Sequence, residues 1–344
     1  MEAVIARSEL TIDIGAVRRN AKTLLAALGG AELWAVVKAD GYGHGAVDAA
    51  GGALGAGATG LCTATVAEAL VLRPEFPTTR IVVMGPASNR EIGQAREARL
   101  ELVVSDDGPL PEDIGLHLKL DTGMGRYGLS ELFAPPVQLV GFMSHLATAD
   151  SDHAFAEQQI ERFREATAPY PGYLRHIANS AAALRIPSAR FDAARCGIAL
   201  YGLSPFGTDP GGDSLEPVLS WRSELAQVRL LQPGESTGYG RTFLAGQPTW
   251  IGIVPVGYGD GFRRDLTGTQ VLVGGELRLV VGTISMDSFT VELPGELPVG
   301  TPVTVIGDGL LAEEHARVAG TITYELACGI NSSPQRAYRA VVDA

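Results

Sequence analysis

A lysine at the end of an apolar segment is the residue best suited to chemistry in this sequence. The run Val36-Val-Lys-Ala-Asp-Gly-Tyr-Gly-His-Gly45 places Lys38 after hydrophobic residues and before a glycine-rich turn. A partly buried lysine has a lowered ammonium pKa, so its neutral amine can attack a carbonyl group and form a Schiff base. The glycines at 41, 43 and 45 lack the final two-residue spacing of a dinucleotide-binding loop. The motif therefore favours a Schiff-base lysine.

Lysine is also rare in this chain. Lys22, Lys38 and Lys119 are its only lysines, and the rest of its 27 basic residues are arginines. An amine can lose its proton and attack a carbonyl carbon or CO₂, whereas a guanidinium cannot. We expect Lys22 to be a surface charge on a polar helix face. Lys119 is a second candidate for amine chemistry.

The composition excludes several classes of protein. The net charge is −12 with no block of like charge, which disfavours nucleic-acid binding. Cys62, Cys196 and Cys328 form no CxxC pair and are expected to be reduced, buried thiols of a cytoplasmic protein. No segment has the roughly 20 apolar residues of a membrane span, and the N-terminus does not resemble a signal peptide. The histidines lack metal-ligand spacing, so no metal site is predicted.

Eight short apolar segments alternate with helical patterns in the first two hundred residues. A first helix is expected at Thr11–Leu28, and later helices at Thr65–Arg73, Asn89–Ala98 and Phe155–Ala168. Eight strands alternating with helices predict a closed (β/α)₈ TIM-type barrel. The expected strands are Leu33–Lys38, Gly60–Ala64, Arg80–Met84, Leu102–Ser105, Gly115–Leu120, Leu139–His145, Arg175–Ala178 and Ala194–Leu200.

The pattern changes after a loop rich in proline and glycine at residues 204–214. Short strands separated by turns follow, which predicts a separate β-rich C-terminal domain. The expected domains are therefore 1–214 and 215–344. The expected elements of the second are strands Ser223–Leu231, Thr249–Pro255, Gln270–Val273, Glu276–Val281, Ser288–Leu293 and Pro302–Gly307, and a helix at Ala312–Ala319.

Polar residues lie where most of the predicted barrel strands end. The carboxyl ends of barrel strands form the rim on which barrel enzymes carry their active sites. We therefore expect a site built from this rim. Its candidate residues are Lys38, Lys119, His145, Asn179, Ser180, Arg195 and Gly197.

Several separated motifs in a fixed order give the chain a family resemblance that extends from Val36 to about Tyr324. The chain resembles the alanine racemases, barrel-type (fold type III) enzymes that use pyridoxal 5′-phosphate. Beside the lysine motif, the resemblance rests on Lys119-Leu-Asp-Thr-Gly-Met-Gly-Arg126, His145-Leu-Ala-Thr-Ala-Asp150, His176-Ile-Ala-Asn-Ser180, Arg195-Cys-Gly-Ile-Ala-Leu-Tyr201, Gly238-Tyr-Gly240, Gly257-Tyr-Gly-Asp-Gly261 and Ser285-Met-Asp287.

The resemblance implies a role for each cofactor-binding residue. Lys38 would carry the cofactor covalently and return as a base. Arg195 would hydrogen-bond the pyridine nitrogen, and because arginine only donates, that nitrogen would stay unprotonated. A weaker electron sink should disfavour transamination. Tyr42, Ser180 and the backbone amides of Gly197 and Ile198 would hold the phosphate, with His145 and Asn179 completing the set.

The resemblance also implies a homodimer with shared active sites. Racemisation needs a base on each face of a planar carbanion, and Tyr239 of the partner subunit would be the second base, assisted by His145 and Arg195. Arg126 would bind the substrate carboxylate, while Lys119 would support it as a carbamate or as a plain amine. The β-rich domain would also contribute Tyr258, Met286 and Asp287 to the substrate site. The product D-alanine would serve peptidoglycan synthesis.

Two positions depart from the family pattern. Ser332, within Gly329-Ile-Asn-Ser-Ser-Pro-Gln-Arg336, stands where a tyrosine often contacts the cofactor phosphate. The first arginine of the run that follows is also absent, which predicts weaker phosphate binding from this side. Ser285 replaces a cysteine, with a mild effect expected.

Three alternative functions remain open at this stage. A racemase of serine or another small amino acid would differ only in its pocket, where a methylene is worth about 1–3 kcal/mol. A non-catalytic pyridoxal-phosphate-binding barrel would lack the second domain. A barrel decarboxylase of basic amino acids would carry a cysteine motif and a different phosphate loop.

Overall fold

The computed structural model describes residues 7–344, and these form two compact units. One unit comprises Gly15–Phe206 and Pro210–Glu216. The other comprises the described residues up to Ile14, Gly207–Asp209 and Pro217–Ala344. Residues 7–14, which we predicted with the first domain, therefore cluster with the second unit. Residues 1–6 of that predicted domain lie outside the described residues.

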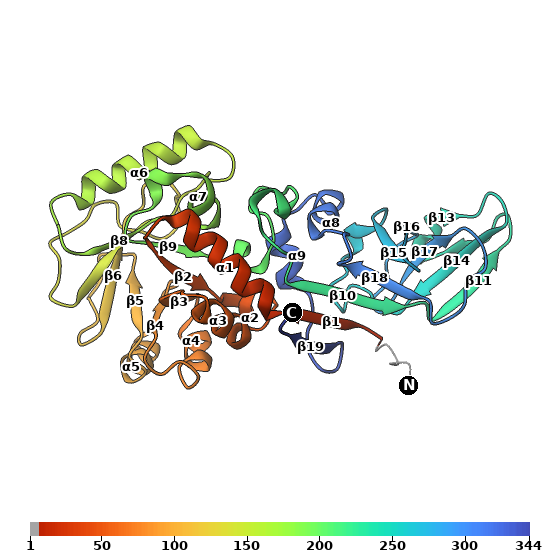
Figure 1. Ribbon diagram of the computed structural model, residues 1–344, viewed down its shortest axis with the longest axis horizontal. Helices are drawn as coiled ribbons and strands as arrows, with labels where there is room; N and C mark the ends of the chain where they lie inside the picture. The colour runs from red at the N-terminus through yellow and green to blue at the C-terminus, as the bar shows by residue number, and fades with distance from the viewer. Residues whose placement is uncertain (1–6) are drawn as a thin grey trace. The chain divides into compact units, whose positions relative to one another are not determined.

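The first unit is a closed barrel of eight parallel strands, as predicted (Figure 1). The strands follow one another in chain order, and pairing of the last with the first closes the barrel. Most strand residues are buried, as expected for a parallel sheet covered on both faces. The strands are β2 (Glu32–Val36), β3 (Gly60–Thr63), β4 (Arg80–Val83), β5 (Glu101–Val104), β6 (Gly115–Lys119), β7 (Leu139–Met143), β8 (Leu174–His176) and β9 (Ala193–Cys196).

Helices surround this barrel, with α4 and α5 along one side and α6 and α7 along the opposite side in Figure 1. In α4 and α5 a capping box satisfies the first backbone N–H groups, using Thr65 with Glu68 and Ser88 with Glu91. Loops replace the helices between β5 and β6 and between β6 and β7 in the described chain. The helices are α1 (Ile14–Leu28), α2 (Lys38–Tyr42), α3 (Ala46–Gly55), α4 (Val66–Leu72), α5 (Asn89–Glu97), α6 (His153–Thr167) and α7 (Ser180–Arg185).

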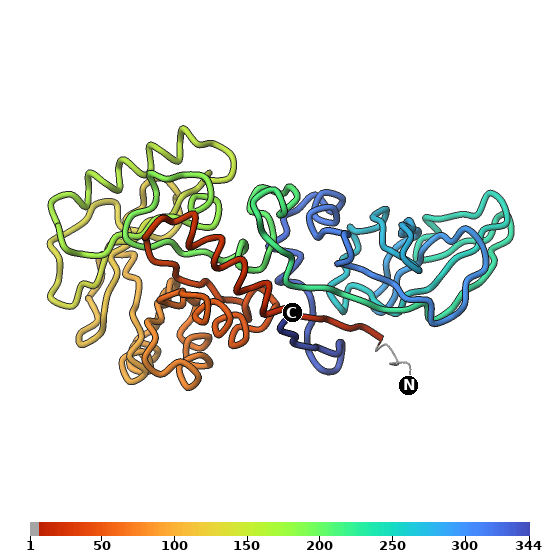
Figure 2. The backbone as a smooth tube through the Cα atoms, viewed as in Figure 1, coloured from red at the N-terminus to blue at the C-terminus, as the bar shows by residue number. Residues whose placement is uncertain are grey.

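The second unit is built on a nine-stranded sheet, which confirms the predicted β-rich domain. The sheet order is β11-β14-β17-β16-β15-β18-β10-β1-β19, so both ends of the described chain lie in neighbouring strands (Figure 2). The strands of this sheet are β1 (Glu9–Asp13), β10 (Leu219–Glu224), β11 (Gln227–Leu231), β14 (Thr249–Val254), β15 (Gln270–Val273), β16 (Glu276–Val281), β17 (Phe289–Leu293), β18 (Pro302–Ile306) and β19 (Tyr338–Val342). The unit also contains a hairpin of β12 (Ser236–Thr237) and β13 (Phe243–Leu244), and helices α8 (Ala312–Ala319) and α9 (Thr323–Gly329).

Several predicted boundaries are wrong. The helix expected from Thr11 begins at Ile14, because Glu9–Asp13 forms strand β1 and pairs with β10 and β19. The single strand expected at Ser223–Leu231 is two strands, β10 and β11. The strand is interrupted at Leu225 and Ala226, whose N–H groups donate to the carbonyls of Thr301 and Ile253, respectively.

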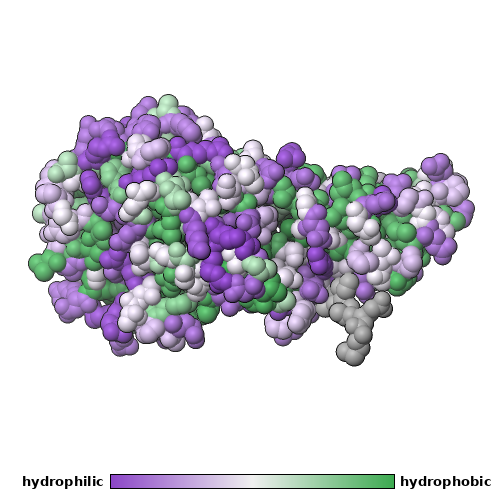
Figure 3. Space-filling view, viewed as in Figure 1, coloured by the Kyte–Doolittle hydropathy of each residue, from purple (hydrophilic) through white to green (hydrophobic). Residues whose placement is uncertain are grey.

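The surface of the chain is mixed in character. Figure 3 shows small groups of hydrophobic residues among hydrophilic ones over both units. Among the described residues, no helix combines the length and apolar character needed to span a bilayer. Cys62 and Cys196 are buried free thiols as expected, but Cys328 is exposed.

Candidate active site

Lys38 lies just beyond the end of β2, in a turn of unusual backbone conformation. The strand ends at Val36 rather than at Lys38, and the lysine begins α2. Residues Ala39, Asp40 and Tyr42 have positive φ angles of 51°, 51° and 55°. Side chains with a Cβ rarely adopt this left-handed conformation, which costs about 1–2 kcal/mol per residue. Lys38 is therefore followed directly by a turn whose backbone is strained.

Local hydrogen bonds hold this turn in place. The side chain of Asp40 accepts from Ala46 N–H at 2.9 Å, and its carbonyl accepts from Gly45 N–H at 2.8 Å. Glu68 of α4 accepts from Ala39 N–H at 2.8 Å. Such over-determination of strained backbone is common at functional sites.

Ser180, Gly197 and Tyr42 come together beside this turn. The Ser180 hydroxyl accepts from Gly197 N–H at 3.1 Å and from Ala199 N–H at 3.4 Å. A Cβ on Gly197 would lie 2.4 Å from the Tyr42 hydroxyl, so only glycine fits this close approach. Ile198 follows, and Asn179 caps α7 by accepting from Ala182 N–H at 3.0 Å. Hydroxyls and backbone N–H groups thus converge in one cradle.

Arg195 is a buried cation in the middle of β9. Its Nη2 donates to the Ser144 carbonyl at 2.8 Å and lies 3.2 Å from His145 Nδ1. Its Nη1 donates to the His176 carbonyl at 2.9 Å and lies 2.7 Å from His176 Nδ1. These contacts fix the guanidinium plane, while burial lowers the pKa of Arg195 to about 10. Arg195 remains a protonated donor near neutral pH.

His145 lies two residues beyond the end of β7, not within the strand as predicted. Burial and the nearby cation of Arg195 hold its pKa well below its usual range. A neutral imidazole has one donor and one acceptor nitrogen. Because Arg195 can only donate, Nδ1 of His145 is the acceptor, and Nε2 carries the proton.

Lys119 is the last residue of β6, one residue before the predicted strand end at Leu120, and it is buried. Its Nζ donates to the Arg126 carbonyl at 3.0 Å. Burial, together with the nearby cations Arg126 and Arg195, lowers the pKa of Lys119 to about 8. The loop that carries the exposed Arg126 is shaped by Asp121, whose carboxylate accepts from three consecutive N–H groups at residues 123–125. Lys119 and Arg126 are therefore neighbours in this structure.

A chain of buried polar groups, which the sequence motifs do not predict, lies behind Arg195. His176 contacts His117, and His117 contacts Glu101. His117 lies two residues before Lys119 on β6, so both side chains point to the same face of the strand. This spacing of two residues is the feature of the sequence that could have indicated that His117 lies on the same strand face as Lys119.

Tyr239 belongs to the second unit and is 71% exposed. It lies between Gly238 and Gly240, whose φ angles are 76° and 73°. A Cβ on Gly238 would meet the backbone nitrogen of Thr283 at 2.7 Å. The glycines therefore let a tight turn pack on its neighbour while the tyrosine ring points outward.

Tyr258, Met286 and Asp287 lie on two adjacent loops of the same unit. Tyr258 N–H bonds to the Ser285 carbonyl at 3.1 Å, and Gly259 N–H bonds to the Met286 carbonyl at 2.9 Å. The side chains of Met286 and Asp287 are 53% and 64% exposed. The loops are thus fixed through their backbones while these side chains face outward.

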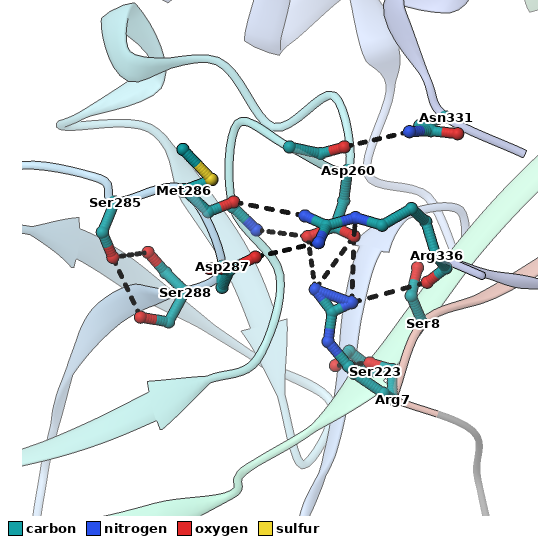
Figure 4. A network of polar contacts seen from close by, with 12 residues as sticks. Arg7, Ser8, Ser223, Asp260, Ser285, Met286, Asp287, Ser288, Asn331 and Arg336 are labelled. Atoms are coloured by element: carbon teal, nitrogen blue, oxygen red, sulfur yellow. Dashed lines mark hydrogen bonds and ion pairs between the residues drawn. The ribbon is translucent and has the colours of Figure 1, made fainter. Parts of the chain in front are cut away.

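Arg336 ties these loops to a buried carboxylate (Figure 4). Its Nε lies 2.9 Å from Asp260 Oδ1, and its Nη1 donates to Asp287 at 2.9 Å. Arg7 donates to the same Asp260 through both of its terminal guanidinium nitrogens, at distances of 2.8 to 3.0 Å. Asp260 is 1% exposed and also accepts from Gly257 N–H at 2.8 Å. Two cations therefore neutralise one buried carboxylate, and Arg336 extends from it to the exposed loop.

Ser285, one of the two departures from the family pattern, has a local structural role. The Ser285 hydroxyl donates to the Ser288 carbonyl at 2.8 Å and closes the loop that carries Met286. Ser332 lies in a segment held by Asn331, which donates to the Gly259 carbonyl at 3.1 Å. The short Ser332 side chain cannot supply the aromatic ring and hydroxyl of a tyrosine.

The barrel residues fit a phosphate-bearing aromatic cofactor. An anion is bound well by hydroxyls and backbone N–H groups, which Tyr42, Ser180 and Gly197 offer together. Arg195, buried and donor-only, suits an unprotonated ring nitrogen. Lys38 is the amine at the same end of the barrel.

The fold and these residues define a two-domain barrel enzyme. The chain belongs to the alanine racemase family, a family of pyridoxal-phosphate-dependent isomerases. Its residues 12–205 match the family described as "Alanine racemase, N-terminal domain", and residues 218–338 match "Alanine racemase, C-terminal domain".

Individual relatives match over nearly their whole length. An alanine racemase of Listeria monocytogenes is 37% identical over 96% of this chain and 97% of its own length. Alanine racemase 1 of Bacillus subtilis is 38% identical over 95% of this chain and 92% of its own length.

Solved structures agree with these matches. Alanine racemase from Streptomyces coelicolor superposes with a TM-score of 0.90 at 37% identity, covering 98% of each chain. Alanine racemase from Bacillus anthracis with bound L-Ala-P superposes with a TM-score of 0.86 at 34% identity, covering 97% of this chain and 95% of that one.

Proposed function

We propose that the protein interconverts L-alanine and D-alanine with pyridoxal 5′-phosphate by a two-base mechanism in a homodimer. The bases are Lys38 and Tyr239 of the partner subunit. The observation that carries this proposal is the contrast between a preformed amine and anion cradle in the barrel and an exposed tyrosine on the other unit. The D-alanine formed would serve peptidoglycan synthesis.

The cofactor would be held by the barrel residues described above. Lys38 would carry it covalently, and Tyr42, Asn179, Ser180, Gly197 and Ile198 would surround its phosphate. Arg195 would donate to the ring nitrogen, with His145 beside it. When bound, pyridoxal phosphate withdraws electrons from the substrate α-carbon and so lowers the barrier to its deprotonation.

The two bases would act on opposite faces of the α-carbon. A single base would return the proton to the face it came from, so inversion needs a second group. Tyr239 of the partner subunit would exchange the α-hydrogen of the L-isomer, and the Lys38 amine that of the D-isomer. A tyrosine hydroxyl needs help to accept a proton near neutrality. The neutral imidazole of His145 and the cation of Arg195 would supply it.

Arg126 would bind the substrate carboxylate with support from Lys119. The depressed pKa of Lys119 supports a reactive amine at this position, because only a neutral amine adds CO₂. We propose that Lys119 is carbamylated, which would place an anion beside Arg126. Tyr258, Met286 and Asp287 of the partner subunit would complete the substrate site, and their exposure in a single chain supports this assignment.

A mixing experiment tests the shared site directly. Lys38→Ala and Tyr239→Phe homodimers should each be nearly inactive. When subunits of the two variants exchange, half of the dimers become hybrids, and each hybrid holds one intact site. Racemisation should therefore recover to about a quarter of the wild-type rate. No recovery, despite hybrids seen by native mass spectrometry, would place both bases in one chain and overturn the shared site.

The proposal includes a cytoplasmic location without membrane or nucleic-acid partners. Its support is the diffuse negative charge, and three cysteines that form no disulfide, which suits a reducing compartment. Fractionation of cells that express the protein, with immunodetection, would test the location.

A further inference from the structure

A hydrogen-bonded chain of side chains runs through the barrel interior to Arg195. His117 Nε2 lies 2.8 Å from Glu101 Oε2, and His117 Nδ1 lies 2.9 Å from His176 Nε2. His176 Nδ1 lies 2.7 Å from Nη1 of Arg195. Both imidazoles are completely buried, whereas the Glu101 side chain is 20% exposed. We call Glu101, His117 and His176 the histidine relay.

The relay connects opposite ends of the barrel. Glu101 is the first residue of β5, and His176 is the last residue of β8. The amino ends of barrel strands lie opposite the rim that carries Lys38. Arg80, the first residue of β4, pairs with Glu101 at 3.1 Å at the same amino end. The relay therefore starts at a charged surface remote from the candidate site.

Only one arrangement of protons satisfies all three relay bonds. The ionised carboxylate of Glu101 can only accept, so His117 Nε2 must donate to it. In a neutral ring the other nitrogen then accepts, and His117 Nδ1 takes the proton of His176 Nε2. His176 Nδ1 is left as the acceptor that Arg195, which can only donate, requires. The carboxylate thus sets the tautomer of both imidazoles.

The charges along the relay agree with this assignment. Burial lowers the pKa of His117 and holds that of His176 well below its usual range, so both rings are neutral. Burial alone would raise the pKa of Glu101, but the bond from His117 and the cation of Arg80 lower it overall. Glu101 is therefore ionised at neutral pH.

Packing keeps the rings from turning. The Trp34 ring lies 4.7 Å from the His176 ring and 5.8 Å from the His117 ring, measured between centroids. Trp34 is itself fixed by a bond from its Nε1 to Glu32 at 2.7 Å. A ring flip of His176 would break contacts on both sides.

We propose that the histidine relay consists of positioning residues that orient Arg195 and keep it a pure donor toward the cofactor ring. This inference rests on the proposed function, because it assumes that Arg195 meets the ring nitrogen. If His176 carried its proton on Nδ1, two donors would face each other and the guanidinium would move. The relay prevents this by a carboxylate that never touches the cofactor.

The first test reads the proton positions themselves. The full-length holoenzyme, labelled with ¹⁵N-histidine, should show both rings in the Nε2–H form by ¹⁵N NMR, with assignment by His117→Gln and His176→Gln variants. Both signals should persist at pH 6, where an exposed histidine is largely protonated. An Nδ1–H tautomer or a doubly protonated ring at either position would overturn the proposal.

The second test breaks the relay at its remote end. Glu101→Met removes the acceptor, whereas Glu101→Gln keeps an acceptor oxygen at the same length. We expect Glu101→Met to mix the His117 and His176 tautomers and to lower the ratio of racemisation to transamination about tenfold. Glu101→Gln should restore both properties. Arg80→Met is the control, because it removes the neighbouring cation and keeps all three relay bonds.

The outcomes separate this inference from the proposed function. Unchanged tautomers and an unchanged reaction ratio in a folded Glu101→Met protein would overturn the relay and leave the racemase proposal intact. A wild-type protein that does not bind pyridoxal phosphate at Lys38 would overturn the proposed function. The histidine tautomers, measured without added cofactor, would still report whether the relay exists.

Discussion

The candidate site residues of the barrel and those of the β-rich unit differ in how they are held. In the barrel, Arg195 and Ser180 are each 3% exposed and have several polar partners. In the β-rich unit, Tyr239 and Met286 are 71% and 53% exposed on loops. The barrel residues are therefore held in place by the packed core of the barrel. Tyr239 and Met286 instead project from loops and are not part of the core of their unit.

The same difference distinguishes residues that are arranged for binding within one chain from residues that are suited to contact with another molecule. Buried polar groups must be satisfied within the fold, so the barrel's donors and acceptors are arranged before any ligand arrives. Exposed aromatic and thioether side chains on fixed loops are typical of surfaces that another molecule covers. We therefore expect substitutions in the barrel to affect stability and cofactor binding together, and those on the β-rich loops to affect catalysis alone.

The largest effect should come from Lys38→Ala. This variant loses both the amine that carries the cofactor and one of the two bases, so racemisation should fall by at least about 10⁴-fold. Borohydride reduction followed by mass spectrometry should find no covalently trapped cofactor. Lys22→Ala is the control, because Lys22 is exposed on α1 and its removal should change neither result. Trapping that persists at another residue would remove Lys38 from its assigned role.

Tyr239→Phe should have the next largest effect, and a one-sided one. Loss of a single general base typically costs about 10²–10⁴-fold. In D₂O, NMR should show that α-hydrogen exchange of L-alanine falls much more than that of D-alanine. The thermal unfolding midpoint should not change, because the substitution removes only a hydroxyl and keeps the aromatic ring. Equal losses for both isomers would argue against a base on one face only.

The sequence alone predicts those features of the fold and of the candidate site that depend on local patterns. The eight barrel strands could be found because each is a buried apolar run between helical patterns. Lys38, Ser180 and Gly197 could be placed together because strand ends in a barrel share one rim. The strand ends differ from the prediction by two residues at Lys38 and His145, because β2 ends at Val36 and β7 at Met143.

Contacts between distant segments could not be predicted in this way. Thr11–Asp13 belong to strand β1 and not to the predicted helix, because β1 is formed by pairing with strands more than 200 residues away. The contacts of Arg7 and Arg336 with Asp260 join three segments that no local pattern connects. The histidine relay was missed for the same reason, although His117 had the right spacing from Lys119.

Substitutions at the two arginines around Asp260 should have opposite signatures. Arg336→Met removes the contact to Asp287 and frees the loop of Met286, while Arg7 still neutralises Asp260. We expect the KM for alanine to rise about 3- to 10-fold, which corresponds to one hydrogen bond of about 0.5–1.5 kcal/mol, with a smaller change in kcat. Steady-state kinetics in both directions measure this.

Arg7→Met provides the matched comparison. It removes a bidentate partner from a buried carboxylate but leaves Arg336 and the loop in contact. Unfolding free energy should fall by about 1–3 kcal/mol in urea titrations, with KM nearly unchanged. If Arg7→Met raised KM as much as Arg336→Met, the loop would depend on Asp260 as a whole and not on Arg336.

The smallest effect concerns the charge of Lys119. Its pKa is lowered from 10.5 to about 8 in the folded protein, chiefly by burial. Below about pH 8 the folded state must hold a proton that burial disfavours, and between about 8 and 10.5 only the unfolded state binds that proton. Loss of the Lys119 proton therefore makes the wild-type protein more stable as pH rises from about 8 to 10.5.

Lys119→Met removes this pH dependence. In buffers purged of CO₂, the variant's stability relative to wild type should be greatest near pH 7 and decline by about 1 kcal/mol toward pH 10, after allowance for solvent screening. Urea titrations at several pH values measure the difference. A constant difference would mean that Lys119 is not a buried amine of lowered pKa. In bicarbonate the decline should disappear if Lys119 is carbamylated, because the native state then holds an anion in place of a titrating amine.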